Sequence, residues 1–148
     1  MSARLIFPFA AAALLAACQS GSPAASAATT TALPTEGSHW RLVSGLDGKL
    51  PPTLDITLEF GADGRIGGNG GCNRYNAVMT LSNDRLEISP VAATKRACMG
   101  EGGGLEAQYF SALSQVTGLS LDGNALRLGL EDGGELRFAP ASGKVDDD

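Results

Sequence analysis

The sequence predicts an α+β domain of mostly β structure, with a curved antiparallel meander sheet, or a small partly open barrel, and one amphipathic helix. Three observations predict this fold. Apolar and polar residues alternate with period two in several short segments. Asp, Asn and Gly separate these segments, and these residues accept the positive φ of tight hairpin turns. Glycine accounts for 20 of the 148 residues and aromatic residues for only 5%, which is typical of a turn-rich fold with a modest core.

The clearest strand pattern lies before residue 61, where Ile56, Leu58 and Phe60 alternate with polar neighbours. Another strand is expected around Ile66. Further alternating segments are expected to form strands at 78–81, 86–89, 119–121, 125–130 and 135–138. The intervening turns are expected at 63–64, 83–84, 122–124 and 132–134. A spacing of roughly ten residues between turns fits a meander that curls toward a barrel.

One segment has a helical period instead. Its apolar residues recur three or four positions apart. They are Leu105, Tyr109, Ala112, Leu113 and Val116. The glycines at 102–104 let the chain enter this helix, and Gly118 can end it. We expect the helix to pack on the sheet or to plug it.

The first residues are typical of a bacterial export signal. Arg4 precedes an apolar run that ends in Leu15-Ala16-Ala17-Cys18. The run is shorter than the roughly 20 residues that span a bilayer. The last four residues resemble the lipobox, in which the cysteine thiol receives a diacylglyceryl group. The sequence therefore predicts a signal peptide over 1–17 and lipidation of Cys18, with an ordinary secreted protein as the alternative.

Lipidation would anchor the chain to a membrane through its acyl chains. Gln19 stands where Asp would resemble an inner-membrane retention signal, which favours the outer membrane, facing the periplasm. Residues 18–37 contain mostly Ala, Ser, Thr, Gly and Pro and are interpreted as a flexible tether after the lipidated cysteine. We expect one domain over 38–140 and an acidic, disordered tail over 141–148.

Composition excludes several classes of function. The formal net charge of −5 argues against a nucleic-acid partner. The one histidine, His39, is expected to be exposed, and it leaves almost no material for a His-based metal site or a Ser–His–Asp arrangement. We therefore expect no catalytic residue, no metal and no cofactor.

Two cysteines, Cys72 and Cys98, remain once Cys18 is acylated. An even pair in an oxidising compartment favours a disulfide. Closing that loop would stabilise the fold by about 3.5 kcal/mol in the chain-entropy model. A redox pair or a nucleophilic thiol is the functional alternative, although the sequence has no Cys-X-X-Cys. Reduced, buried thiols are the third interpretation.

The most distinctive segment is the glycine-rich run from Gly67 to Tyr75. It lacks the Lys and Ser/Thr of a phosphate-binding loop, and it lacks the βαβ frame of a dinucleotide site. The run predicts a bulged strand or a tight corner, in which glycine lets the backbone approach the bridge closely.

Three basic residues, Arg74, Lys95 and Arg96, are near the two cysteines in sequence. If they gather around the bridge they form a small basic spot suited to an anionic group. Ordinary solvated charge is the alternative interpretation. Trp40 is expected in the core or as a plug at the end of the barrel. Met79 and Met99 are expected to fill gaps in the core.

Several short motifs follow one another along residues 38–140. They are Trp40-Arg41-Leu42, Leu58-Glu59-Phe60, Gly64-Arg65-Ile66, Gly71-Cys72-Asn73-Arg74-Tyr75, Ala93-Thr94-Lys95-Arg96-Ala97-Cys98, and Glu106 with Phe110 and Leu113. In that order they resemble the META/HslJ-like domain family. The resemblance implies a curved antiparallel sheet with a helix and no shared catalytic residues. It also implies lipoproteins associated with heat or envelope stress and with drug tolerance.

The resemblance also assigns structural roles to motif residues. It implies that Cys72 and Cys98 form the bridge, and that Asn73 and Thr94 are turn or capping groups. The other positions carried over as structural are Trp40, Gly71, Arg74, Tyr75, Lys95 and Arg96.

Together these observations predict a non-enzymatic, membrane-anchored envelope lipoprotein, active in envelope or heat-stress tolerance, that binds a protein partner or an apolar ligand. They predict an apolar groove or barrel mouth between helix and sheet, flanked by the glycine-rich run. Two alternatives stay open, a thiol or acid/base hydrolase that uses Cys98 and a purely structural envelope component.

Overall fold

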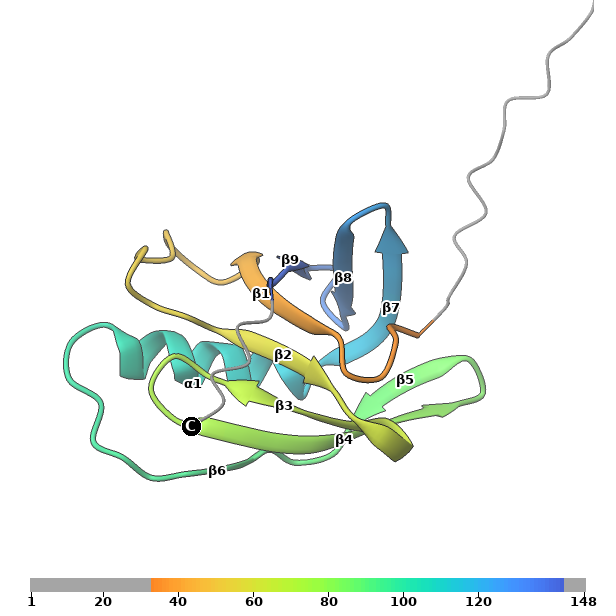
Figure 1. Ribbon diagram of the computed structural model, residues 1–148, viewed down its shortest axis with the longest axis horizontal. Coiled ribbons are helices and arrows are strands. Elements are labelled where there is room, and N and C mark those ends of the chain that lie inside the picture. The colour runs from red at the N-terminus through yellow and green to blue at the C-terminus, as the bar shows by residue number, and fades with distance from the viewer. Residues whose placement is uncertain (1–32, 143–148) are drawn as a thin grey trace, which may run out of the picture.

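The computed structural model describes residues 33–142 (Figure 1). The predicted signal peptide, the lipidation site Cys18, most of the predicted tether and the acidic tail from residue 143 lie outside the described residues.

The described chain forms strands separated by short turns, and one α-helix. In order they are β1 (His39–Ser44), β2 (Thr57–Phe60), the 3-10 turn η1 (Ala62–Gly64), β3 (Arg65–Asn69), β4 (Arg74–Ser82), β5 (Arg85–Ile88), β6 (Ala92–Ala93), α1 (Gly102–Leu113), β7 (Val116–Asp122), β8 (Ala125–Leu130) and β9 (Glu135–Pro140). The pairings between these strands are antiparallel. The predicted class, mostly β with one helix, is confirmed.

Two meanders share one sheet. The strand order is β5-β4-β3-β2-β1-β9-β8-β7, and the short β6 pairs with β4. The meanders join at β1 and β9, where Trp40 lies opposite Pro140 and Leu42 opposite Phe138. The two ends of the order, β5 and β7, come close together, but no ladder joins them within residues 33–142. The sheet is therefore curved without being a closed barrel, as predicted.

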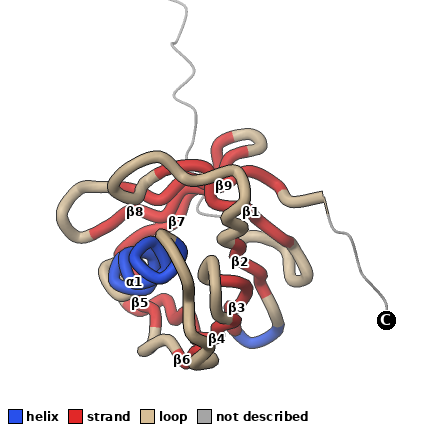
Figure 2. Tube along the Cα trace, turned by 90° about the vertical axis from the view of Figure 1, so that its left-hand side faces the viewer, coloured by secondary structure: helices blue, strands red, loops and turns tan. Residues whose placement is uncertain are grey.

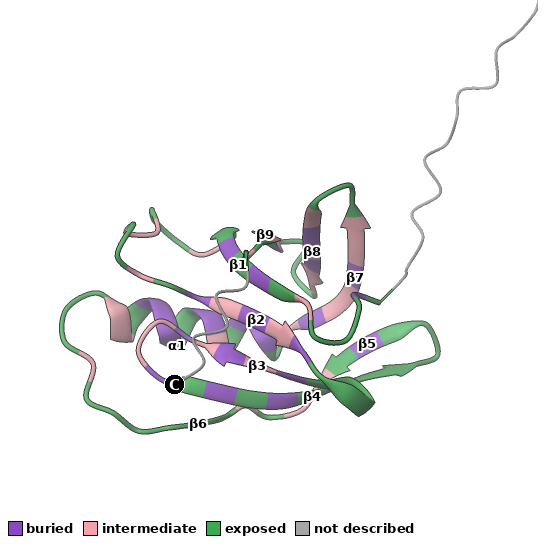
Figure 3. Ribbon diagram, in the orientation of Figure 1, coloured by how far each residue is buried: buried purple, intermediate pink, exposed green. Residues whose placement is uncertain are grey.

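The helix α1 fills the concave side of this sheet. Figure 2 looks nearly along the helix and shows strands curving round it. Leu105, Tyr109 and Leu113 are buried on its inner face. In Figure 3 buried residues alternate with exposed ones along β4, as expected for a strand with one face on the core. Leu58, Leu126, Leu128 and Leu136 have no exposed surface, so the space between helix and sheet is packed with side chains.

The helix boundaries differ from the prediction. The glycines at 102–104 form its first turn, and it ends at Leu113, so Val116 and Gly118 belong to β7. Val116 fits a helical period and a strand period equally well. The ladder with β8, in which Val116 lies opposite Leu130, pairs this segment as a strand.

The polar turn residues adopt the predicted backbone conformation. Asp63, Asn83 and Asp84 have φ values of 55°, 50° and 61°, in the left-handed region that Asn and Asp tolerate. Trp40 is buried in the core and His39 is exposed. Met79 is buried as expected, but Met99 is 94% exposed and the prediction of a core position for it is wrong.

Candidate functional site

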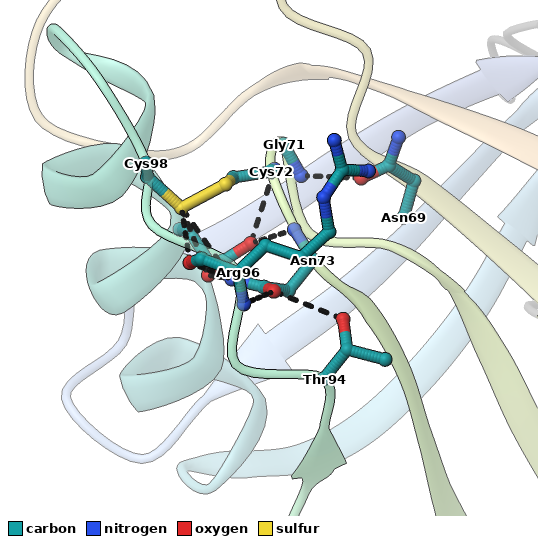
Figure 4. The surroundings of a disulfide bond; sticks show 8 residues. Asn69, Gly71, Cys72, Asn73, Thr94, Arg96 and Cys98 are labelled. Carbon is teal, nitrogen blue, oxygen red and sulfur yellow. Dashed lines mark hydrogen bonds between the residues drawn. A yellow bond between two sulfur atoms is a disulfide. The ribbon is translucent and has the colours of Figure 1, made fainter.

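A disulfide joins Cys72 to Cys98 at one end of the sheet (Figure 4). Cys72 lies in the disulfide corner, residues 69–73, which connects β3 to β4. Cys98 lies in the Cys98 loop, residues 94–101, which leads into α1. Their Cα atoms are 5.8 Å apart, and the bridge confirms the predicted pairing. The bridge joins the disulfide corner to the Cys98 loop, two segments that contain few apolar side chains.

A buried carboxylate, Glu106 of α1, holds the disulfide corner through hydrogen bonds. Its Oε2 accepts hydrogen bonds from the backbone N–H groups of Cys72 at 3.1 Å and of Asn73 at 2.6 Å. Its Oε1 accepts a bond from Asn73 Nδ2 at 2.7 Å. Burial of a carboxylate is costly unless hydrogen-bond donors replace water. Here three N–H groups replace water as donors to the carboxylate. Glu106 has no ion-pair partner among residues 33–142, so these hydrogen bonds are what compensates its burial.

The Asn73 side chain links this corner to the Cys98 loop. Asn73 Oδ1 accepts bonds from Thr94 Oγ1 at 2.9 Å and from the Arg96 N–H at 2.7 Å. Its amide nitrogen donates to Glu106. Asn73 is only 5% exposed, so each of these groups would be left without a partner if the side chain were removed. Asn73 and Thr94 therefore belong to one hydrogen-bonded link between the disulfide corner and the Cys98 loop.

Glycine is required where the corner passes closest to α1. A Cβ at Gly70 would lie 2.6 Å from Phe110 Cζ and 3.1 Å from Glu106 Oε2. Gly71 has φ +116°, and its N–H donates to Asn69 Oδ1 at 3.0 Å. The run thus forms a tight corner, and the close backbone approach at Gly70 is to Phe110 and Glu106 of α1.

Two tyrosines stand behind the corner. The Tyr75 hydroxyl donates to the Thr57 carbonyl at 2.9 Å, so the Tyr109 hydroxyl, 2.7 Å away, donates to Tyr75. Burial raises the pKa of Tyr75, and it raises the pKa of Tyr109 well above its ordinary value. Both hydroxyls stay protonated at neutral pH and serve as a buried hydrogen-bonded pair.

An open cleft of about 500 Å³ lies beside the bridge. Its lining residues come from three segments and are Pro51, Thr53, Leu54, Gly71, Cys72, Arg96, Ala97, Cys98, Met99, Glu101 and Gly102. Met99 stands at this cleft and not in the core because the disulfide and Asn73 fix the Cys98 loop on the outside of the corner.

The backbones of the three predicted basic residues lie close together, because the Thr94 N–H donates to the Arg74 carbonyl at 3.0 Å and the Arg96 N–H donates to Asn73 Oδ1. The side chains of Arg74 and Arg96 nevertheless line different hollows. Arg96 lines the cleft, and in Figure 4 its side chain extends toward Asn69. Arg74 lines a separate hollow with Ala92 and Ala93, and Lys95 is exposed. Within the part of the chain that the structure describes, none of the three forms an ion pair. Only the backbone of Arg96, and not its charge, joins the network around Asn73.

Cys72, Cys98 and Glu106 place their sulfur and oxygen atoms within 4.8 Å of one another. These are metal-ligand types, but each sulfur is bonded to the other and neither is a thiolate. For the same reason Cys98 is no nucleophile in this state. A hydrolase that uses Cys98 would first need the bridge to be opened.

Other hollows do not match the predicted apolar groove. The one between α1 and the sheet, about 440 Å³, is lined largely by polar residues such as Asp47, Gln108 and Gln115. A mainly apolar hollow, about 120 Å³, lies at the opposite end and is lined by Leu33, Phe60 and Met79. The glycine-rich run flanks the cleft beside the bridge instead. No helix within residues 33–142 is long and apolar enough to cross a membrane.

Glu106 is the one residue of the network that the sequence analysis does not single out as a site residue. A helical projection contains the signal, because Glu106 precedes Tyr109 by three positions and Leu113 by seven. A carboxylate on the buried face of an amphipathic helix indicates a partner in the core.

Comparisons with known proteins support the fold. A family model for the META domain matches residues 31–143. An NMR structure of a protein from Burkholderia xenovorans is similar, with 27% identity and a TM-score of 0.59, over 73% of this chain and 84% of that one. A second NMR structure has 22% identity and a TM-score of 0.56, over 70% of this chain and 89% of the other. No curated protein matches the chain.

Proposed function

The chain belongs to the META domain family, and on this premise we propose that it is a non-enzymatic, lipid-anchored protein of the bacterial envelope that binds a partner protein. Its role is in tolerance of heat or envelope stress. The observation that carries the proposal is the open cleft beside the disulfide, with the exposed side chain of Met99 at it.

The hollows favour a protein partner over an apolar small molecule. Sites for small molecules generally enclose roughly 300–1,000 Å³ of mainly apolar space. The apolar hollow near Leu33 has about 120 Å³. The larger cleft is open and mixes Met99 and Leu54 with Arg96 and Glu101. Exposed Met and Arg are enriched in protein interfaces, so this surface suits a protein better than a free lipid or drug.

The entry point of the chain supports presentation of the cleft away from a membrane. Pro34 is buried beside Leu33, and the Gly37 N–H donates to the Phe60 carbonyl at 2.7 Å. Leu33 contacts the Met79 end of β4, whereas the disulfide corner precedes Arg74 at the other end (Figure 1). The cleft and the point at which the described chain begins therefore lie toward opposite ends of β4.

The side chains at the cleft support a non-enzymatic role. Cys98 is in the disulfide, and both Glu106 oxygens already accept hydrogen bonds. His39 is exposed on β1, and its Nδ1 lies 3.7 Å from Glu59 Oε1. Within residues 33–142 these groups form no pair of nucleophile and base of the kind that hydrolases use.

Site-specific photocrosslinking in living cells tests the proposed surface. A photoreactive residue at Met99 is expected to yield a discrete adduct, because that side chain is exposed at the cleft. The matched control is the same residue at Leu81, which is 51% exposed at the other end of β4. A discrete adduct from Met99 and none from Leu81 supports the proposal. Equal yields from both positions, or none from either, would overturn it.

The anchor and the stress role are tested separately. Cys18→Ser is expected to abolish incorporation of labelled palmitate and to move the protein into the soluble fraction. A deletion strain is expected to lose tolerance to heat and detergent and to regain it with the wild-type gene but not with Cys18→Ser. Full complementation by the unlipidated variant would show that the function does not require the lipid anchor.

A further inference from the structure

The two sulfurs of the bridge have different surroundings. Cys98 Sγ lies 3.6 Å from the Arg96 carbonyl oxygen and 3.9 Å from Glu106 Oε1. Asn73 Nδ2 is 3.4 Å from the same sulfur, but that amide also donates to Glu106 at 2.7 Å. Cys72 meets Glu106 through its backbone N–H. Among the described residues, no hydrogen bond reaches the Cys72 sulfur, although a Glu106 oxygen lies within 4.8 Å of it.

These surroundings oppose negative charge on Cys98. A thiolate there would face a carboxylate and a carbonyl oxygen, whereas a thiol could donate to either of them. The first turn of α1, where Gly103 approaches Cys98 Cβ, contributes a partial positive charge. The full charge of Glu106 at 3.9 Å outweighs that partial charge. The Arg96 guanidinium extends toward Asn69 and not toward the sulfur (Figure 4).

We propose that the bridge is a thiol-exchange site of fixed polarity, at which an incoming thiolate attacks Cys98 Sγ and Cys72 leaves as the thiolate. The new bond joins the incoming sulfur to Cys98. The Cys72–Cys98 bond breaks, and its electron pair goes to Cys72 Sγ. The co-reactant is a small thiol or a protein dithiol, and the step consumes no oxidant. The inference goes beyond the binding role and does not depend on it.

The two segments also differ in their capacity to carry an adduct. Both cysteines line the cleft and are reachable from solvent. The Cys98 loop has exposed residues on both sides of the cysteine, Ala97 and Met99. The disulfide corner is held by Glu106 and by the bond from Gly71 to Asn69. A bulky group on Cys98 therefore disturbs fewer buried contacts than one on Cys72.

Peptide mapping after partial exchange tests the polarity. The oxidised protein is incubated briefly with glutathione, quenched with acid and alkylated with N-ethylmaleimide. Trypsin separates the two cysteines because Arg74 and Lys95 lie between them. We expect glutathione on Cys98 and maleimide on Cys72, in about tenfold excess over the reverse product, since the better-stabilised thiolate leaves faster. Equal amounts, or an excess of glutathione on Cys72, would overturn the proposal.

Two variants identify the cause. Glu106→Gln removes the charge but keeps the size of the side chain, so the preference is expected to fall toward parity. Glu101→Gln removes a carboxylate that lines the same cleft but does not belong to the group of Glu106 and the two sulfurs within 4.8 Å of one another, so the tenfold preference is expected to persist. An unchanged preference in Glu106→Gln would refute the electrostatic explanation. The wild-type map does not depend on the folding of either variant.

Discussion

The two ends of the sheet are closed by different kinds of interaction. At the disulfide corner a covalent bond and the hydrogen bonds of Asn73 and Glu106 hold glycine-rich backbone against α1. At the opposite end Leu33 and Pro34 line an apolar hollow together with Phe60 and Met79. The difference follows from the local sequence, because a corner made of glycines has few side chains to bury and needs polar or covalent links instead.

The apolar end should show the largest single effect. Phe60→Ala is expected to lower the free energy of unfolding by about 4 kcal/mol, because it removes a buried aromatic ring and leaves a cavity. Urea denaturation measures the loss, which should be the same with and without reductant. Leu81→Ala, at an exposed position near the same hollow, is the control and should change stability little. A loss that depends on reductant would mean that the two ends are coupled.

Removing the bridge at the disulfide corner should lower the free energy of unfolding almost as much as Phe60→Ala does. The double variant Cys72→Ser with Cys98→Ser is expected to lose about 3.5 kcal/mol, since the unfolded chain regains the entropy of a closed loop. The loss should appear in urea denaturation, and wild-type protein in reductant should match the variant. A fully stable variant would show that the hydrogen bonds alone hold the corner.

The polar network should contribute less than the bridge but remain measurable. Asn73→Ala is expected to cost about 2–3 kcal/mol, because the Arg96 N–H and Glu106 lose a buried partner. Asn76→Ala is the matched control, since Asn76 is an exposed asparagine on β4, three residues after Asn73, and it should cost less than about 0.5 kcal/mol. Thermal unfolding of both variants compares them directly, and equal losses would contradict a special role for Asn73.

The last expected effect is a pH dependence at the buried tyrosine pair, and it is confined to alkaline pH. Tyr75 and Tyr109 have a pKa raised by burial in the folded protein. The unfolded chain therefore releases their protons first, above about pH 10, and stability falls there by about 1.4 kcal/mol per pH unit for each tyrosine. The chain has only two tyrosines, so tyrosinate absorbance should appear together with unfolding. Absorbance that rises while the fold persists would refute the buried pair.

Local sequence signals predicted most strands, because alternation and turn chemistry act over a few residues. The alternation at Ile56 and Leu58 and the turn at Asn83 and Asp84 are examples. The end of the helix was not predictable in this way, since the ladder with β8 decides where Val116 belongs. The pairing of β1 with β9 also depends on residues far apart in the chain.

At the candidate site the sequence predicted the bridge and the glycine corner but not their support. Glu106 reaches the corner only through the docking of α1, which no local pattern specifies. Met99 follows a cysteine in a loop, and its exposure depends on how the bridge orients that loop. The exposure of apolar and charged side chains in such loops is set by tertiary contacts and not by composition.

The central place of β1 sets an order of events during synthesis. Among the strands of residues 33–142, β1 is made first, but one of its two neighbours, β9, is made last. A nascent chain that already holds β2 to β5 and both bridging cysteines still exposes an unpaired backbone edge beside Leu42. Such long-range pairing slows folding, so the domain cannot mature progressively from its N-terminus. Truncation after Leu130 would therefore open the middle of the sheet and not merely shorten its border.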